Sequence, residues 1–321
     1  MKKGFIICSI VASSLVLLGI LLFLGVLLSV KGEFGMFGNA RLETNTYEIT
    51  DDFDSVSLKT DTADVVFLVS EDGICRVVCY ERESMGHAVT VEEGTLSVQL
   101  EDTRKWYEHI SLFSVGHPMI TVYLPEREYV DLSVKVSTGD VELPAQMGFE
   151  RIEVLGTTGD VNCSASARES VKIKTTTGAI CVENVSAGQM GLQVSTGKMT
   201  VSGVSCDGDL SVSVSTGKSY LTDIACKNLY STGNTGDISL KNVIASETFS
   251  IERSTGDVTL EECDAAELFL RTDTGDVEGS LCSEKIFMVM TDTGDIDVPK
   301  TVTGGRCEVT TDTGDIKITV H

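Results

Sequence analysis

The chain has 321 residues and carries 48 Asp and Glu against 25 Lys and Arg, for a net charge of −23. Binding to nucleic acid relies on clustered Lys and Arg, and the sequence has no basic stripe, so we expect no nucleic-acid partner. Aromatic residues make up only 6% of the chain. The core must therefore come from Val, Ile, Leu and small residues, which suits a narrow solenoid better than a thick sandwich.

The first segment, residues 4–30, contains no charged side chain. A helix of that length measures about 40 Å, against a hydrocarbon core of about 30 Å, so residues 1–31 are predicted to form a tilted transmembrane anchor. Lys2 and Lys3 precede the span, which keeps the N-terminus in the cytoplasm and places the body outside. The alternative, a cleaved signal peptide, would have a shorter apolar region and a small-x-small cleavage site. Residues 32–44 are interpreted as a stalk.

Residues 45–130 contain one imperfect copy of the motif that fills the rest of the chain. The segment Thr60 to Val65 has Ala63 where the later copies have glycine, and Ala63 lies 76 residues, four times nineteen, before Gly139. We therefore predict degenerate coils here, distorted by an insertion around Trp106, with a role in capping the regular repeats.

Residues 131–321 repeat the dipeptide Thr-Gly at steps of 19 or 20 residues. The glycines are Gly139, Gly159, Gly178, Gly197, Gly217, Gly236, Gly256, Gly275, Gly294 and Gly314. Apolar residues recur seven and five positions before each glycine and two and four positions after it. Alternation by two indicates strands with one buried face, and the change of parity at the glycine indicates a corner. A third apolar position, seven after the glycine, predicts a shorter third wall.

This pattern predicts an all-β fold, a parallel β-helix of 19–20-residue coils in which each coil pairs with the next. A right-handed turn is expected from the usual chirality of parallel crossovers. Ten coils at about 4.8 Å would form a rod roughly 50 Å long. The last segment, Asp315 to His321, is a strand with nothing after it, and we expect it to leave open strand edges.

An aspartate follows the corner glycine in most coils, and in the last three coils a second aspartate precedes it. Stacked carboxylates repel one another unless they are solvated or bridged by a cation, and calcium favours oxygen ligands. Two readings stay open, hydrogen bonding of the turns and a calcium site. The candidate calcium ligands are Asp273, Asp276, Asp292, Asp295, Asp312 and Asp315. Ala179, Lys198 and Lys218 interrupt the column.

Cysteine and threonine also recur at matched positions. Cys206 with Cys226, and Cys263 with Cys282, share offsets in adjacent coils, so each pair either forms a disulfide or fills the core as thiols, the reading that we favour. The first Thr of each Thr-x-Thr, as at Thr175, has inward parity and is expected to pack in the core or corner. This parity argues against a flat threonine face that binds ice or carbohydrate.

Catalysis has little support in this sequence. We find no phosphate loop, no nucleophile elbow and no cluster of histidines at metal-ligand spacing, so no catalytic residue and no cofactor are assigned. His87, His109 and His117 lie in the irregular N-terminal segment. Short coils without inserted loops also leave nowhere to build an enzyme cleft.

The sequence resembles the bacterial "putative adhesin" β-strand-repeat family, a domain of unknown function found in envelope proteins. The resemblance covers residues 45–321 and rests on Phe53–Val56, Thr60–Val65, Gly94–Val98 and Val122–Pro125, together with the Thr-Gly-Asp coils. It implies a parallel β-helix on the bacterial cell envelope, anchored by the N-terminal helix, without a catalytic residue.

The function expected from these observations is a non-catalytic one. A single-pass protein of the bacterial cell membrane would hold its acidic solenoid outside and bind an envelope protein or a glycan, as in adhesion. The alternative is a scaffold or sensing arm of an envelope-stress system. A calcium-binding solenoid is a further alternative.

Overall fold

The computed structural model describes residues 14–20, 42–82, 85–102 and 117–321. The chain divides into one unit of Met1–Arg41 with Arg104–Gly116, and a second of Leu42–Thr103 with His117–His321. In the first unit only the short helix at 14–20 is described, so most of the predicted anchor and stalk lies outside the described residues. No helix in the described part of the chain is long and apolar enough to cross a membrane.

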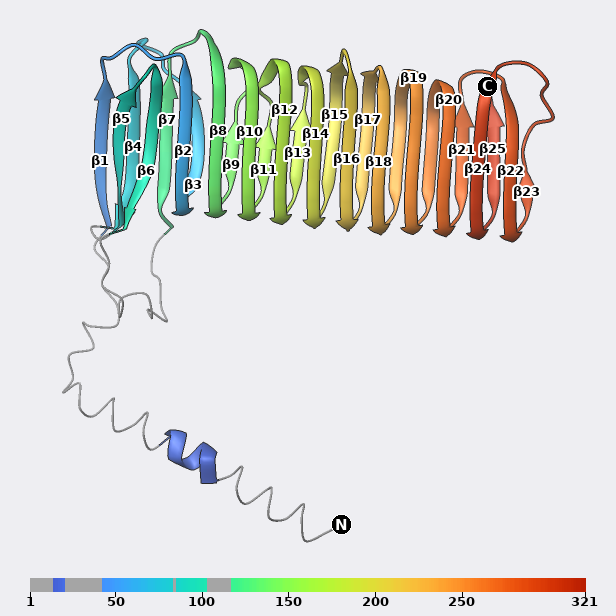
Figure 1. The fold of residues 1–321 in the computed structure, drawn as a ribbon, viewed down its shortest axis with the longest axis horizontal. Helices are drawn as coiled ribbons and strands as arrows, with labels where there is room; N and C mark the ends of the chain where they lie inside the picture. Colours follow the sequence, from blue (N-terminus) through green and yellow to red (C-terminus); the bar gives the residue numbers. More distant parts are fainter. Residues whose placement is uncertain (1–13, 21–41, 83–84, 103–116) are drawn as a thin grey trace. The chain divides into compact units, whose positions relative to one another are not determined.

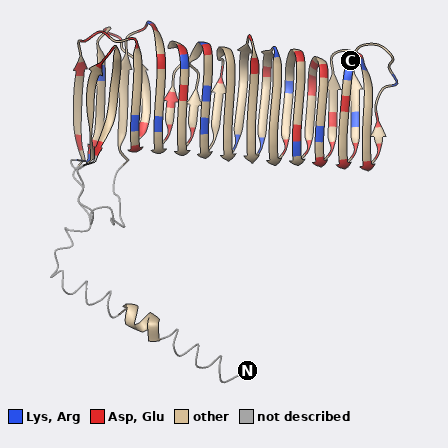
Figure 2. Cartoon of the chain, in the orientation of Figure 1, with Lys and Arg blue, Asp and Glu red and all other residues tan. Residues whose placement is uncertain are grey.

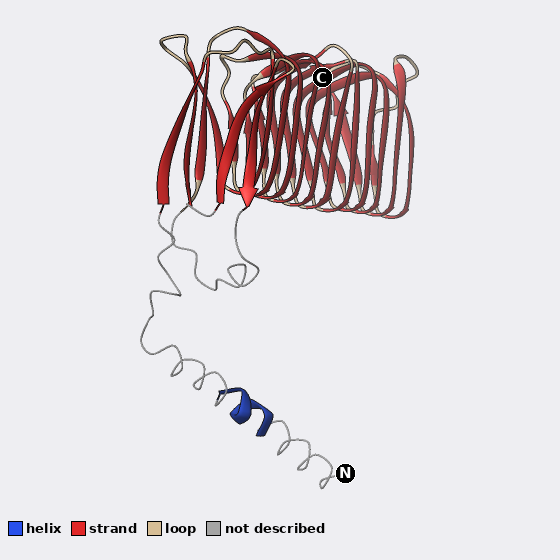
Figure 3. Ribbon diagram, turned by 60° about the vertical axis from the view of Figure 1, so that its left-hand side comes forward, coloured by secondary structure: helices blue, strands red, loops and turns tan. Residues whose placement is uncertain are grey.

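The second unit is a β-solenoid whose coils follow one another along a single row (Figures 1 and 3). Its N-terminal strands are β1 (Leu42–Ile49), β2 (Ser55–Thr62), β3 (Asp64–Val69), β4 (Cys75–Arg82), β5 (Met85–Glu92), β6 (Thr95–Asp102) and β7 (Met119–Leu124). The strands that follow are β8 (Glu128–Thr138), β9 (Val141–Leu143), β10 (Gly148–Thr158), β11 (Val161–Cys163), β12 (Ser166–Thr177), β13 (Ile180–Glu183), β14 (Ser186–Thr196), β15 (Met199–Cys206), β16 (Asp209–Thr216), β17 (Ser219–Cys226), β18 (Asn228–Thr235), β19 (Ile238–Thr255), β20 (Val258–Thr274), β21 (Val277–Leu281), β22 (Lys285–Thr293), β23 (Ile296–Asp297), β24 (Gly305–Thr313) and β25 (Ile316–Val320). The predicted parallel solenoid is confirmed.

The core consists of inward columns in register from coil to coil. Ile173 of β12 lies beside Val154 of β10 on one side and Leu192 of β14 on the other, and all three are buried. Val182 of β13 belongs to the wall beyond the corner and is buried too. The period of two along each strand and the parity change at Thr-Gly therefore place both walls around one core, as the sequence predicts.

The corner glycines have φ values between 127° and 155°. A Cβ at any of these positions would lie 1.8–2.3 Å from the carbonyl oxygen of the corner residue in a neighbouring coil. Glycine is thus required for two reasons, the positive φ and the close approach of the neighbouring backbone. A second corner, six residues later, has left-handed Asn184, Gly203, Asp223, Asn242 and Glu262, with φ between 50° and 63°.

The N-terminal segment departs from the degenerate coils that the sequence predicts. The coil β2–β3 stacks directly on β8–β9, with Thr62 beside Thr138 and Val65 beside Val141. A second coil, β6–β7, lies on its other side in parallel register. In contrast, three pairs of strands are antiparallel: β1 with β4, β4 with β7, and β5 with β6. The reversals occur at Gly73 and at Glu93–Gly94, where positive φ values allow tight turns.

The C-terminal coils are not stacked in sequence order. β24 lies between β20 and β22, with Thr313 beside both Thr274 and Thr293. The coil β22–β23 is therefore the end of the row, and the final strand β25 is enclosed between β21 and β23. This corrects the expectation that the last strand is the open edge. Pro299, just after β23, has no N–H to give to a ladder, and an edge coil tolerates this loss best.

Candidate functional site

The aspartate column that follows the corner glycines forms a hydrogen-bonded ladder. Asp160 Oδ1 accepts the backbone N–H of Ala179 at 2.7 Å, and Asp140 Oδ1 accepts that of Asp160 at 2.7 Å. Carboxylates of this kind satisfy amide groups that the corner turns away from the strand ladder. Where Lys218 interrupts the column, its ammonium group pairs with Asp237 in the next coil at 2.8 Å. That ion pair, with the N–H of Asp257, lowers the pKa of Asp237.

The predicted calcium ligands lie at this same corner in the last three coils, in a different order from the sequence. Asp276 Oδ1 accepts the N–H of Asp315 at 2.8 Å, and Asp315 Oδ1 accepts that of Asp295 at 2.8 Å. In the column of aspartates that precede the corner glycine, Asp273 forms an ion pair with Arg271 at 3.5 Å. Asp292 and Asp312 of the same column are exposed. The two acceptor carboxylates thus already bind protein amides, so a calcium ion here would have to use their remaining oxygens.

The inward threonines bond to the corner instead of forming a surface. Thr272 Oγ1 donates to the carbonyl of Gly256 at 3.1 Å, and Thr311 Oγ1 donates to that of Gly275 at 3.1 Å. Both side chains are buried. Packing at the corner, as expected for the first Thr of each Thr-x-Thr, is confirmed.

The nine described cysteines are free thiols. Cys206 and Cys226 are buried in adjacent coils, as the core reading requires, and burial raises the pKa of Cys226 to about 12. Cys263 is buried beside Leu281, not beside Cys282, because the register shifts between β20 and β21. Cys282 is consequently exposed.

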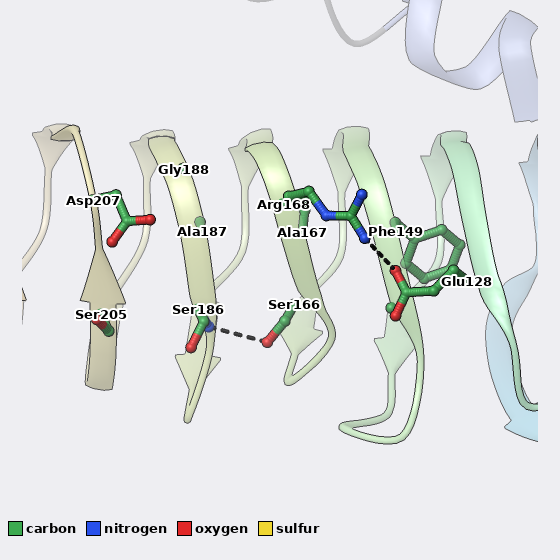
Figure 4. A pocket seen from close by; sticks show the side chains of 11 residues that line it. Glu128, Phe149, Ser166, Ala167, Arg168, Ser186, Ala187, Gly188, Ser205 and Asp207 are labelled. Carbon is green, nitrogen blue, oxygen red and sulfur yellow. Dashed lines mark hydrogen bonds and ion pairs between the residues drawn. The ribbon is translucent and has the colours of Figure 1, made fainter.

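An open hollow of about 380 Å³ runs over the third wall of the solenoid (Figure 4). Small side chains stack there, with Ser205 in register beside Ser186, whose N–H donates to Ser166 Oγ at 3.0 Å. Arg168 and Glu128 border the hollow and lie 3.5 Å apart. The hollow exists because small side chains occupy a column that holds bulkier side chains in other coils. Along the solenoid as a whole, basic side chains are dispersed among acidic ones (Figure 2).

The terminal coil β22–β23 exposes a different surface. β22 pairs with β24 on one side, and no other described strand pairs with it. Its outward side chains are apolar and exposed: Ile286 is 44%, Met288 is 44% and Met290 is 59% exposed. An unpaired edge with exposed apolar side chains is a template for pairing with another chain. Sequence analysis missed this site, because the coil order that creates it is not visible in the repeat.

Residues 53–213 and 204–321 match the Toastrack DUF4097 family. No curated protein matches the sequence. A "putative adhesin" from Bacteroides fragilis is 13% identical, with 88% of this chain and 98% of that chain covered and a TM-score of 0.38. A "putative adhesin" from Parabacteroides distasonis is 10% identical over 75% of this chain and 98% of its own, with a TM-score of 0.47.

A third solved structure, described as a "putative lipid binding protein" from Parabacteroides distasonis, is 17% identical. The match covers 75% of this chain and 95% of that chain, with a TM-score of 0.42. The family match spans most of the sequence and agrees with the resemblance drawn from the Thr-Gly-Asp coils. The chain therefore belongs to the Toastrack DUF4097 family, whose domain has no known function.

Proposed function

We propose that this chain is a non-catalytic protein of the bacterial cell envelope that binds an extended segment of another protein at its terminal coil. The observation that carries the proposal is the open edge of β22, where exposed Ile286, Met288 and Met290 lie on one outward face. A strand added to such an edge gains backbone hydrogen bonds, and its alternate side chains gain specificity from the apolar face.

The charges around the terminal coil favour one kind of partner segment. Asp292, Asp295 and Asp297 are exposed at the corner end of β22 and β23. An extended apolar segment with Lys or Arg at one end would complement this arrangement. A second copy fits less well, because two β22 strands paired antiparallel about Met288 would set Asp292 against Glu284, and like charges directly opposite are destabilising.

The proposed location rests on residues 1–31. Their apolar run and the preceding Lys2 and Lys3 support a single-pass anchor with a cytoplasmic N-terminus and an extracytoplasmic solenoid. In that position the terminal coil would meet envelope or surface proteins. The acidic body would also be repelled by anionic lipid headgroups, so it would stand off the membrane.

The test is site-specific photo-crosslinking of the tagged full-length protein in its native cells, followed by mass spectrometry. A crosslinker at Met290 should capture a defined protein, while one at Tyr230, which is 40% exposed in the middle of the solenoid, should not. With the crosslinker at Met290, Ile286→Lys with Met288→Lys should abolish capture, and Tyr220→Lys with Tyr230→Lys should preserve it. Capture at Tyr230 alone, or capture at Met290 that survives the Ile286 and Met288 changes, would overturn the proposal.

The identity of the captured protein separates adhesion from regulation. A surface protein, or a protein of another cell, supports an adhesive role. An integral membrane sensor or transporter supports the scaffold or sensing arm. Capture of the same chain at Met290 would show that the coil is a self-association surface, which would contradict the choice of partner made here.

A further inference from the structure

A buried polar cluster lies in the N-terminal cap, away from the terminal coil. Cys79 and Glu81 are two residues apart on β4, so their side chains point to the same face, and His87 reaches them from β5. The three side chains are 0%, 2% and 5% exposed. One ligand atom of each lies within 4.8 Å of the other two, and no other group of three such side chains occurs among the described residues.

Outer contacts hold the ligands in place. Glu81 Oε1 accepts the side-chain N–H of Asn45 at 2.7 Å, and His87 Nε2 is bonded to Thr60 Oγ1 at 3.0 Å. These two contacts leave Glu81 Oε2 and His87 Nδ1 facing each other at 2.6 Å. The hydroxyl of Tyr47 donates to the carbonyl of His87 at 3.2 Å. Metal-binding histidines and carboxylates typically have their second polar atom fixed in this way.

The order Thr60, His87, Glu81 also resembles a nucleophile, a base and an orienting acid. However, all three side chains are buried. The hollow next to Thr60 and His87 has a volume of about 10 Å³, roughly the space that one water molecule needs. A substrate cannot enter such a space, so the arrangement does not support catalysis.

The charges of the cluster match a divalent ion. A Cys79 thiolate and a Glu81 carboxylate together carry two negative charges, and a neutral His87 adds none. The resulting metal site is neutral, which matters because buried charges are costly unless they are compensated. Arg82, whose Nε is buried without a partner among the described residues, lines the same small hollow and would disfavour a site with net positive charge.

We propose that Cys79, Glu81 and His87 bind a zinc ion that ties β4 to β5 within the antiparallel cap. Sulfur, nitrogen and carboxylate oxygen are the ligands that zinc takes in proteins, whereas calcium and magnesium take oxygen alone. Binding replaces the hydrogen bond between His87 Nδ1 and Glu81 Oε2 with bonds from the metal to Sγ, Nδ1 and Oε2. The thiol proton of Cys79 passes to solvent, and the proton of the neutral imidazole moves from Nδ1 to Nε2, which then donates to Thr60 Oγ1. No step changes an oxidation state. The site is distinct from the aspartate corner in position and in chemistry.

The test uses the full-length protein in detergent, stripped with a chelator and then titrated with Co²⁺ or Zn²⁺ alone. One equivalent of Co²⁺ should bind and give a thiolate-to-metal charge-transfer band. Cys79→Ser should lose the band, while Cys75→Ser, a buried cysteine on the same face of the same strand, should keep it. Asn45→Ala should weaken Zn²⁺ binding by about 10–100-fold, because it frees the carboxylate that Asn45 orients.

The outcomes are decisive in either direction. Zn²⁺ should raise the unfolding temperature of the wild-type protein and of Cys75→Ser, but not that of Cys79→Ser or His87→Gln. Equal affinity in Cys79→Ser, or a cobalt spectrum without a thiolate band, would overturn the proposal. If circular dichroism shows that Cys79→Ser does not fold, X-ray absorption of the zinc-loaded wild-type protein decides, and a coordination shell without sulfur would refute the site.

Discussion

Replacing Gly197 with alanine should open the coils around this residue, whereas the same replacement at Gly191 should not. Gly197 has a φ of 155°, and a Cβ there would lie 1.8 Å from the carbonyl oxygen of Gly178 in the neighbouring coil. Gly191 lies in the same coil, in strand β14, and a Cβ there would meet nothing within 4 Å. The pair therefore isolates the corner from the general effect of a glycine substitution.

The magnitude follows from two contributions. A residue other than glycine with this backbone conformation costs about 1–3 kcal/mol. Relieving the overlap also separates the two coils and weakens two hydrogen bonds between them, Gly178 N–H to Thr196 O at 3.1 Å and Ile180 N–H to Lys198 O at 2.9 Å. Each is worth about 0.5–1.5 kcal/mol. The expected loss is about 2–6 kcal/mol for Gly197→Ala, against a gain of about 0.4–1 kcal/mol for Gly191→Ala.

Hydrogen–deuterium exchange is the appropriate assay, because coils of a solenoid can open locally. In the coils next to Gly197, exchange should accelerate by between about thirtyfold and about twenty-thousandfold, since every 1.4 kcal/mol is about a factor of ten. Coils far along the row should change little. If Gly197→Ala and Gly191→Ala exchange equally slowly, the requirement for glycine at the corner is refuted.

Three further predictions concern other parts of the solenoid. Asp160→Ala removes the acceptor of the Ala179 N–H and should cost about 0.5–1.5 kcal/mol in thermal unfolding. Asp160→Asn should cost almost nothing, and calcium should raise the unfolding temperature no more than magnesium. Larger stabilisation by calcium would favour the metal reading of the corner. Burial lowers the pKa of Arg253 from 12.5 to about 10, so between these values the unfolded chain binds a proton that the folded chain has lost, and stability rises with pH. Arg253→Met should thus have a larger free energy of unfolding than the wild type at neutral pH, measured by denaturant unfolding. The difference between the two proteins should shrink above about pH 10. A difference that does not change with pH would argue against a charged arginine in the core. Finally, amides of β24 should exchange more slowly than those of β22, although β24 is nearer the C-terminus, and the reverse order would contradict the stacking of the last coils.

The sequence by itself determined the repeating part of this protein. A period of 19–20 residues, alternation by two and a parity change at Thr-Gly are local properties, and each coil repeats them, so the pattern alone places residues such as Ile173 and Val182 in the core, where they are buried. The need for glycine at Gly197 could be predicted in the same way. The corner aspartates were identified too, with hydrogen bonding of the turns as one of two readings.

The order of the coils was decided only by the tertiary structure. Every coil offers much the same ladder to its neighbours, so the sequence contains no local signal that β24 lies between β20 and β22. That order leaves one edge of β22 unpaired, beside the outward side chains of Met288 and Met290.

The fold of the cap, too, depends on pairing between segments that are distant in the sequence. The turn at Glu93–Gly94, between the paired strands β5 and β6, was a readable hairpin signal, but the nineteen-residue spacing favoured coils instead. Cys79 and His87 have no metal-ligand spacing along the chain. They lie close together only because β4 and β5 pair antiparallel. Thr60, from the first coil, is hydrogen-bonded to His87. A site formed by antiparallel strands has no fixed spacing that recurs in the sequence, whereas in stacked coils the core residues recur at the same position of every repeat.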